Sequence, residues 1–108
     1  MGETLQIIRE RRSVRSYKPD MIPEETLQKI LEAGTWAATG MGRQSPIIVA
    51  VTNKELRDRL SHMNAKIMGT DTDPFYGAPV VLIVLADKHV PTHVYDGSLV
   101  MANLMLAA

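Results

Sequence analysis

The sequence predicts a fold that combines helices with at least two strands in one domain. Helices are indicated by apolar residues that recur at three- and four-residue spacing, as in residues 27–34. Strands are indicated by two short, continuously apolar and β-branched runs, IIVAVT at 47–52 and VVLIVLA at 80–86. Such runs are typical of strands that are buried on both faces. The length of 108 residues leaves room for one domain of ordinary size.

The first two helices are expected in the N-terminal third of the chain. The segment ETLQIIRER predicts a short helix that ends near Arg11 or Arg12. The clearest helix start follows at Pro23, because a proline at the first helical position has no N–H to leave unpaired, and two glutamates come directly after it. Gly34, near the end of this helix, would let a neighbouring element approach closely.

Two further helices are expected after the strands. Asn53 can cap the first of them and Gly69 can end it. Its apolar stripe is expected to consist of Leu56, Leu60, Met63 and Ile67. The last helix covers residues 95–108 and is apolar nearly all round, so we expect it to be covered on every side. Because the sequence stops while this pattern is still helical, we expect residues 1–108 to be part of a larger fold that ends within a helix.

Composition argues against several classes of function. Twelve Lys and Arg balance twelve Asp and Glu, so no global field attracts nucleic acid or an anionic membrane. The absence of cysteine excludes disulfides, thiolate metal sites and cysteine nucleophiles. The longest apolar run is too short to span a bilayer, and the N-terminus does not resemble a signal peptide. We therefore expect a cytoplasmic protein that binds neither nucleic acid nor a membrane.

A basic cluster is the first candidate for a binding site. Five of the twelve cations lie within the ten residues from Arg9 to Lys18. Within this stretch Arg11, Arg12 and Arg15 surround Ser13, and guanidinium groups together with a hydroxyl match a phosphate dianion. The alternative is that cations gather at a helix C-terminus because the helix dipole favours them there. The residues alone leave both interpretations open.

The second candidate is the small-residue stretch ATGMGRQSP at 38–46. Thr39, Gly40 and Gly42 make this backbone flexible, and its N–H groups could approach a flat ligand. Arg43 and Gln44 offer side-chain donors to a heterocycle. The alternative is an ordinary connection between a helix and a strand.

No motif indicates a metal site or a set of catalytic side chains. His89 and His93 have a spacing that suits a metal on a helix, but Pro91 lies between them and breaks any helix, so no metal is expected. The sequence has no P-loop, nucleophile motif or zinc signature. This pattern favours an enzyme whose cofactor performs the chemistry, and it equally favours a protein that is no enzyme.

Four ordered segments resemble the nitroreductase family of flavoenzymes. They are RRSVRSY at 11–17, PEETLQKILEAGTWAATGMGRQSP at 23–46, DPFYGAPVVLIVLAD at 73–87 and DGSLVMANLMLAA at 96–108. The resemblance implies an α+β fold, with a mainly antiparallel sheet flanked by helices, and intimate homodimers that bind FMN at their interface. Because family members continue well beyond the last of these segments, it also implies a truncated fold. Residues 1–108 would then be the N-terminal portion of a single nitroreductase-like domain.

The resemblance assigns cofactor-binding positions to eight residues. Four of them would hold the ribityl phosphate of FMN: Arg11, Arg12, Ser13 and Arg15. Three match the loop that reaches the flavin of the partner subunit: Thr39, Gly40 and Met41. Gln44 matches a residue that lies close to the flavin ring or to this loop.

The reaction implied by the resemblance is transfer of a hydride from NAD(P)H through the flavin to a nitroaromatic or quinone acceptor. No catalytic side chain is assigned, because the flavin stores the electrons and the protein positions it. The alternative is a non-catalytic, truncated family fragment that folds or oligomerises without flavin.

Overall fold

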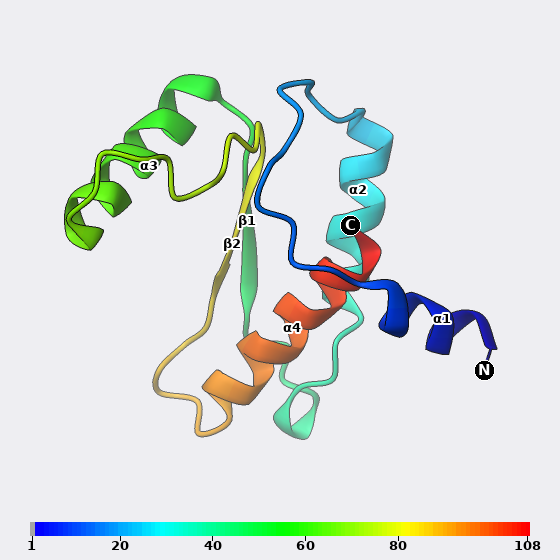
Figure 1. Ribbon diagram of the computed structural model, residues 1–108. Helices are drawn as coiled ribbons and strands as arrows, with labels where there is room; N and C mark the ends of the chain where they lie inside the picture. Colours follow the sequence, from blue (N-terminus) through cyan, green and yellow to red (C-terminus); the bar gives the residue numbers. More distant parts are fainter. Residues whose placement is uncertain (1) are drawn as a thin grey trace. The chain divides into compact units, whose positions relative to one another are not determined.

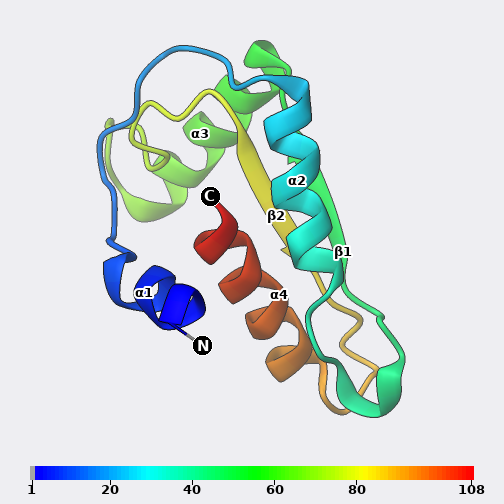
Figure 2. The same cartoon turned by 90° about the vertical axis from the view of Figure 1, so that its right-hand side faces the viewer.

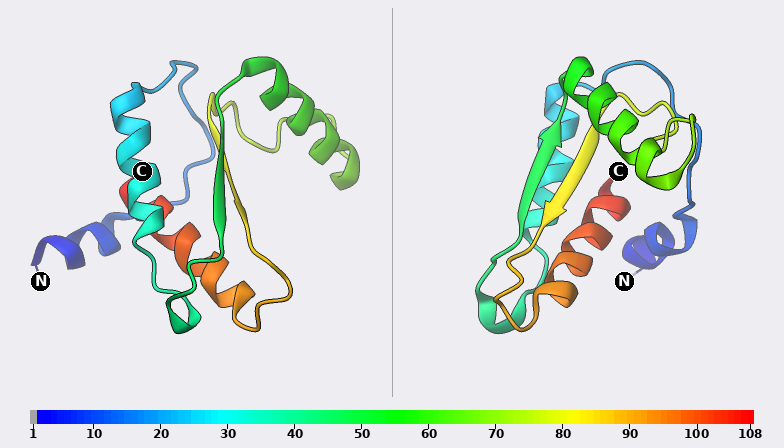
Figure 3. Two further views of the ribbon diagram at one scale, coloured as in Figure 1. Left: turned by 180° about the vertical axis from the view of Figure 1, so that it is seen from behind. Right: turned by 90° about the vertical axis from the view of Figure 1, so that its left-hand side faces the viewer.

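The computed structural model describes residues 2–108, which form helices and one small sheet. The elements are α1 (Gly2–Glu10), α2 (Glu24–Thr35), the short 3-10 helix η1 (Gly40–Gly42), β1 (Ile47–Val51), α3 (Lys54–Met68), β2 (Val81–Leu85) and α4 (His93–Ala107) (Figure 1). The two strands pair in one sheet and run in opposite directions (Figure 3). This arrangement confirms the predicted α+β class.

The chain forms two compact units, each built from segments that are separate in the sequence. Unit 1 contains residues 2–12, 23–49 and 84–108, and unit 2 contains residues 13–22 and 50–83. Both strands contribute residues to both units, so no single linker divides the chain. That residues 1–108 form a single domain stays a prediction.

In unit 1, α2 packs closely against α4 (Figure 2). A β-carbon at Gly34 would lie 2.7 Å from Ile48 Cδ1 and 2.8 Å from Leu104 Cδ2, so glycine permits this close approach, as predicted. Beside it, Asn103 Nδ2 donates a 2.9 Å hydrogen bond to the carbonyl oxygen of Ala33. Apolar side chains buried in this unit include Leu27, Ile30, Ala37, Val100 and Leu104.

The helix boundaries follow from local rules and lie close to the predicted ones. Asn53 caps α3 by accepting a 2.9 Å hydrogen bond from the N–H of Leu56. Gly69 ends the same helix with φ 74°, in the left-handed region. Pro23 differs by one position from the prediction: its ψ of 144° is extended, so it precedes the first helical residue of α2. Helix α1 ends at Glu10, next to the expected end.

The prediction that both strands are fully buried is wrong. In β1, Val51 is buried, but Ile47 is 57% exposed, and in β2 Leu85 is 49% exposed. The physical reason is that the sheet of the described residues has only two strands, so the side chains of each strand have cross-strand neighbours on one side only. The apolar runs therefore predicted the strands correctly and their burial incorrectly.

Helix α4 is also less covered than its composition led us to expect. It buries the stripe Asp96, Val100 and Leu104, which are spaced four residues apart, so they lie on one face. Several apolar side chains outside this stripe are exposed, and they include Val94, Tyr95, Leu99, Met101 and Met105, whereas Leu106 is half-buried. Within residues 2–108, no helix has the length and apolar character that a membrane span requires.

In unit 2, helix α3 buries a polar face and exposes an apolar one. The buried residues are Arg57, Ser61 and Ala65, again four residues apart. Met63 and Ile67 of the predicted apolar stripe are exposed, Ile67 by 86%. The predicted apolar stripe is therefore not the buried face of this helix.

The polar face of α3 is buried because Asp73 supplies an acceptor for it. One oxygen of the Asp73 carboxylate forms an ion pair with Arg57 Nη2, and the other accepts a 2.7 Å hydrogen bond from Ser61 Oγ. The backbone N–H groups of Phe75 and Gly77 also donate to this carboxylate, at 3.0 and 2.8 Å. Arg57 Nε donates to the carbonyl oxygen of Ala78 at 2.8 Å, so the guanidinium links α3 to the following turn.

This network sets the protonation state of Asp73. Burial alone would raise the pKa of Asp73, but the hydrogen bonds from Arg57, Ser61 and the backbone N–H groups hold that pKa well below its usual range. Because the pKa is lower in the folded state than in the unfolded state, the carboxylate stabilises the fold at neutral pH. That contribution is lost as the pH falls below the unfolded pKa, near about 4.

Truncation of Leu104 tests the packing between α2 and α4. We expect Leu104→Ala to lower the free energy of unfolding by about 2–4 kcal/mol, because it leaves a cavity below Gly34. Met105→Ala is the matched control, since Met105 is the next residue and is exposed. Urea unfolding followed by circular dichroism at 222 nm measures the free energy of unfolding of both variants. An equal decrease in the two variants would contradict the packing of α2 against α4.

Replacement of Asp73 tests the polar centre of unit 2. We expect Asp73→Asn to lower the free energy of unfolding at pH 7 by about 1.5–3 kcal/mol, because it removes charge-assisted hydrogen bonds. The difference from the native protein should shrink as the pH is lowered to about 3, because the carboxylate of the unfolded chain then becomes protonated while that of the folded protein stays charged. Asp71→Asn, an exposed neighbour, serves as the control and should have little effect at either pH. A difference that did not depend on pH would refute the role given to the Asp73 charge.

Candidate functional site

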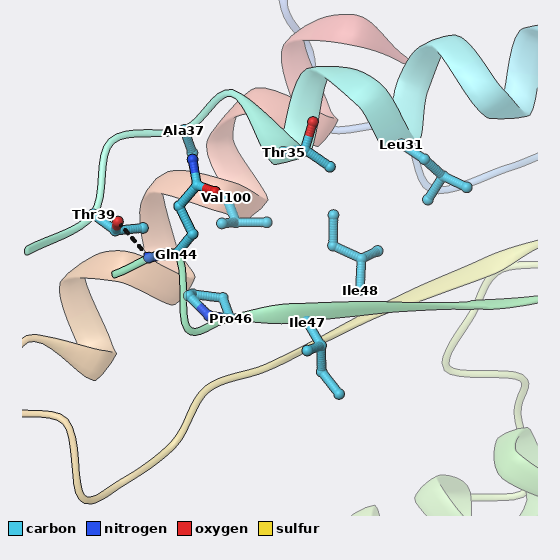
Figure 4. A pocket seen from close by; sticks show the side chains of 9 residues that line it. All are labelled: Leu31, Thr35, Ala37, Thr39, Gln44, Pro46, Ile47, Ile48 and Val100. Carbon is cyan, nitrogen blue, oxygen red and sulfur yellow. Dashed lines mark hydrogen bonds between the residues drawn. The ribbon is translucent and has the colours of Figure 1, made fainter. Parts of the chain in front are cut away.

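The loop of residues 39–44 carries four of the predicted cofactor residues, Thr39, Gly40, Met41 and Gln44, and it is folded tightly on itself. Thr39 Oγ1 accepts a 2.9 Å hydrogen bond from the N–H of Gln44, which closes the loop (Figure 4). Met41 and Gln44 have φ values of 56° and 50°, in the left-handed region that non-glycine residues adopt at a cost of about 1–3 kcal/mol. Contacts with the rest of unit 1 must offset this cost.

A buried carboxylate ties the 39–44 loop to the start of α4. Asp96 is 1% exposed, and its Oδ1 accepts a 2.9 Å hydrogen bond from the N–H of Gly40. Its Oδ2 accepts a 2.8 Å hydrogen bond from the hydroxyl of Thr92. A β-carbon at Gly40 would overlap the Thr92 side chain, so glycine is required at this position.

The sequence interpretation did not single out Asp96, although a signal for it exists. It is the only charged residue between Val94 and Ala108, within the most apolar helix of the chain. A lone carboxylate in such a helix has to find hydrogen-bond donors if it is buried. The sequence could therefore have indicated a buried polar contact at Asp96, but not that Gly40 would be its donor.

An apolar pocket lies beside the 39–44 loop in unit 1 (Figure 4). Its volume is about 370 Å³, within the range of small-molecule sites. Its walls come from α2, the 37–46 connection, β1 and α4, and they consist of Leu31, Thr35, Ala37, Thr39, Gln44, Pro46, Ile47, Ile48 and Val100. Two predicted site residues, Thr39 and Gln44, thus border this pocket, whereas Met41 is 89% exposed at the tip of the loop.

The predicted phosphate cluster, which consists of Arg11, Arg12, Ser13 and Arg15, is exposed throughout. Arg11 and Arg12 belong to unit 1, and Ser13 and Arg15 belong to unit 2. Arg12 Nη1 donates to the carbonyl oxygens of Arg9 and Arg11, at 2.9 and 2.8 Å. These bonds agree with the alternative interpretation, in which cations gather at the C-terminus of a helix. The convergence of these four residues on one anion stays a prediction.

The chemistry of the phosphate cluster fits the phosphate group of FMN. By residue type, the three guanidinium groups offer donors with positive charge and the hydroxyl offers a further donor, and both kinds of group suit phosphate oxygens. Among residues 2–108, the ion pairs formed with carboxylates involve Lys29, Lys54 and Arg57, so the charge of the cluster is not neutralised by a neighbouring acid.

The histidines do not gather into a metal site in the described part of the chain. In residues 2–108, no group of three or more His, Asp or Glu side chains could hold a metal ion. The ring of His93 instead places Nδ1 2.8 Å from the carbonyl oxygen of Val90. His93 therefore takes part in the turn that leads into α4.

Comparison with known proteins decides the family. A sequence model described as "Nitroreductase family" matches residues 8–108. The chain belongs to the nitroreductase family. This confirms the resemblance of the four ordered segments, and it places both the 39–44 loop and the phosphate cluster within the matched region.

Solved nitroreductases have the same fold as this nitroreductase-family chain. A nitroreductase with bound FMN from Bacteroides fragilis superimposes with a TM-score of 0.86 at 32% identity. Another nitroreductase with bound FMN, from Desulfitobacterium hafniense, superimposes with a TM-score of 0.87 at 32% identity. Both matches cover 100% of this chain and 65% of the solved chain.

In sequence, the chain is similar to an FMN reductase (NAD(P)H) from Bacillus subtilis. The two are 29% identical over 87 residues, which cover 81% of this chain and 33% of the Bacillus protein. The chain therefore spans less than two thirds of the length of each of these three relatives.

Proposed function

We propose that the protein is an FMN-dependent NAD(P)H oxidoreductase that passes hydride to small electron-poor acceptors such as nitroaromatics or quinones. The observation that carries this proposal is the match of the whole chain to two nitroreductases that were solved with FMN bound. The similarity to an FMN reductase (NAD(P)H) supports NADH or NADPH as the reductant. When bound, FMN supplies the redox chemistry by accepting and returning the electrons.

The phosphate cluster binds the ribityl phosphate in this proposal. Arg11, Arg12 and Arg15 provide forked donors that match phosphate oxygens, and Ser13 adds a hydroxyl donor. Arginine stays protonated at all physiological pH values, so the charge of the cluster does not vary with pH. Local charge of this kind is needed because the formal net charge of the protein is zero.

The 39–44 loop faces the flavin ring in this proposal. Thr39, Gly40 and Met41 reach the flavin of the partner subunit, and Gln44 lies near the ring or near residues 39–41. The exposed position of Met41 and the apolar pocket beside Gln44 support this role. The chain's own residues position the ring and exclude water from it, so the proposal assigns no acid–base pair.

The protein acts in this proposal as a homodimer or larger homo-oligomer in the cytoplasm, without nucleic-acid or membrane partners. The exposed apolar side chains of α4 support an oligomer, because exposed apolar surface of this kind is typical of a protein–protein interface.

A comparison of FMN with riboflavin tests the phosphate cluster. We expect Arg11→Ala and Arg15→Ala to weaken FMN binding by about 10- to 100-fold, as for loss of one charge-assisted hydrogen bond. Binding of riboflavin, which has no phosphate, should not change. Arg9→Ala is the matched control, because Arg9 belongs to the same basic stretch but not to the cluster. Titration of flavin fluorescence measures all the affinities.

Two other outcomes of this titration are informative. Equal weakening of FMN and riboflavin would contradict the phosphate role of the cluster. A native protein that is folded but retains neither flavin would favour the alternative of a non-catalytic family fragment.

A charge on the exposed face of α4 tests the oligomer. We expect Leu99→Asp to raise the dissociation constant of the oligomer by about tenfold or more, because an unpaired charge is costly to bury in an interface. Ser98→Asp adds the same charge at the preceding exposed position of the helix and serves as the control. Light scattering on a sizing column measures the mass of each variant as a function of concentration. A native protein that is monomeric at every concentration would refute the proposed oligomer.

A further inference from the structure

We propose that Asp96 is a positioning residue that fixes the 39–44 loop in the form that faces the flavin. The flavin part of this statement rests on the proposed function, whereas the fixing of the loop does not.

The surroundings of Asp96 explain why it can hold the loop. A carboxylate that is 99% buried requires donors, and Asp96 has two: the N–H of Gly40, from the loop, and the hydroxyl of Thr92, the residue directly before α4. Asp96 also lies in the first turn of α4, where the positive end of the helix dipole favours a negative charge. The side chain is therefore held on the helix and directs its remaining oxygen to the loop.

The 39–44 loop depends on this contact more than on its own hydrogen bonds. Its internal bonds, such as that from the N–H of Gln44 to Thr39, close the loop but do not attach it to another element. Among the described residues 2–108, residues 39–44 form one hydrogen bond to another element, and it is the bond from Gly40 to Asp96. Since Met41 and Gln44 hold unfavourable positive φ values, a loop without this bond would relax.

The chemistry of the contact predicts which substitutions keep it. In Asp96→Asn, the amide oxygen can accept from Gly40 and the amide NH₂ can donate to Thr92, so the contact is retained in neutral form. In Asp96→Leu, the side chain has a similar size but no acceptor, so Gly40 and Thr92 both lose their partner. A purely space-filling role would predict the opposite order, because leucine suits a buried position better than asparagine.

Limited trypsin digestion measures the loop directly in the flavin-free chain. Arg43 is the only Lys or Arg between Lys29 and Lys54, so cleavage after Arg43 reports opening of the loop. We expect Asp96→Leu to speed this cleavage by at least about tenfold relative to native, and Asp96→Asn to restore a rate close to native. Asp87→Asn is the control, because Asp87 is an exposed carboxylate of the same unit that bonds only to a nearby backbone N–H.

Gly40→Ala tests the contact from the other side, and it remains available if Asp96→Leu does not fold. The added methyl group would overlap Thr92, so it should push the loop off Asp96 and speed cleavage after Arg43. Because both substitutions break one contact, the double variant should be cleaved no more than about twofold faster than the faster single variant. Native cleavage rates in Asp96→Leu and in Gly40→Ala would overturn the proposal.

Flavin binding tests the second part of the proposal. We expect Asp96→Leu to weaken the binding of FMN and of riboflavin equally, by about tenfold, and to shift the absorption band of the bound flavin. Asp96→Asn should have an affinity and an absorption band close to those of the native protein. The phosphate-cluster variants are expected to weaken the binding of FMN but not of riboflavin, so phosphate binding by the cluster and loop positioning by Asp96 are distinguishable. An open loop with unchanged flavin affinity and spectrum would overturn the positioning role. If the native protein binds neither flavin, the proposed function fails, and the cleavage rates alone decide whether Asp96 fixes the loop.

Discussion

One stripe of α4, formed by Asp96, Val100 and Leu104, is the constraint on which unit 1 depends. At one end of the stripe, Leu104 packs where Gly34 leaves room for it. At the other end, Asp96 holds the N–H of Gly40. The same face of one helix thus builds the core and fixes the loop that the proposed function assigns to the flavin. Both contacts require a glycine on the opposite side, because a β-carbon at Gly34 would collide with Leu104 of α4, and one at Gly40 would collide with Thr92, the residue before α4.

Unit 2 depends on the charge of Asp73 as well as on buried apolar residues such as Val51. Asp73 gathers donors from α3 and from the turn that follows it, and Arg57 carries the connection on to Ala78. Removal of one partner from such a network leaves an uncompensated charge, which is costlier than loss of an ordinary surface ion pair. The network therefore specifies how residues 70–78 fold against α3, and apolar packing alone would specify this less strictly.

The sequence predicted features that depend on near neighbours and missed those that depend on distant ones. Asn53 and Gly69 act within a few residues, so the limits of α3 were predictable. The buried face of α3 was not, because Arg57 is buried by a carboxylate 16 residues away. The anchor of the 39–44 loop joins residues 56 apart, beyond any local pattern. The residues themselves indicated the basic cluster and the 38–46 stretch as candidates, and the family resemblance supplied their roles toward FMN. The meeting of Arg11 to Arg15 around a phosphate stays a prediction.

Helix α3 buries polar side chains and exposes apolar ones, and this has a consequence for protein engineering. Methods that rank substitutions by hydropathy would protect Met63 and Ile67 and would treat Arg57 and Ser61 as tolerant surface positions. The burial of these residues reverses that ranking. A library that randomises Met63 and Ile67 to polar residues should therefore retain most of its folded members and improve in solubility, whereas one that randomises Arg57 should consist mostly of destabilised chains.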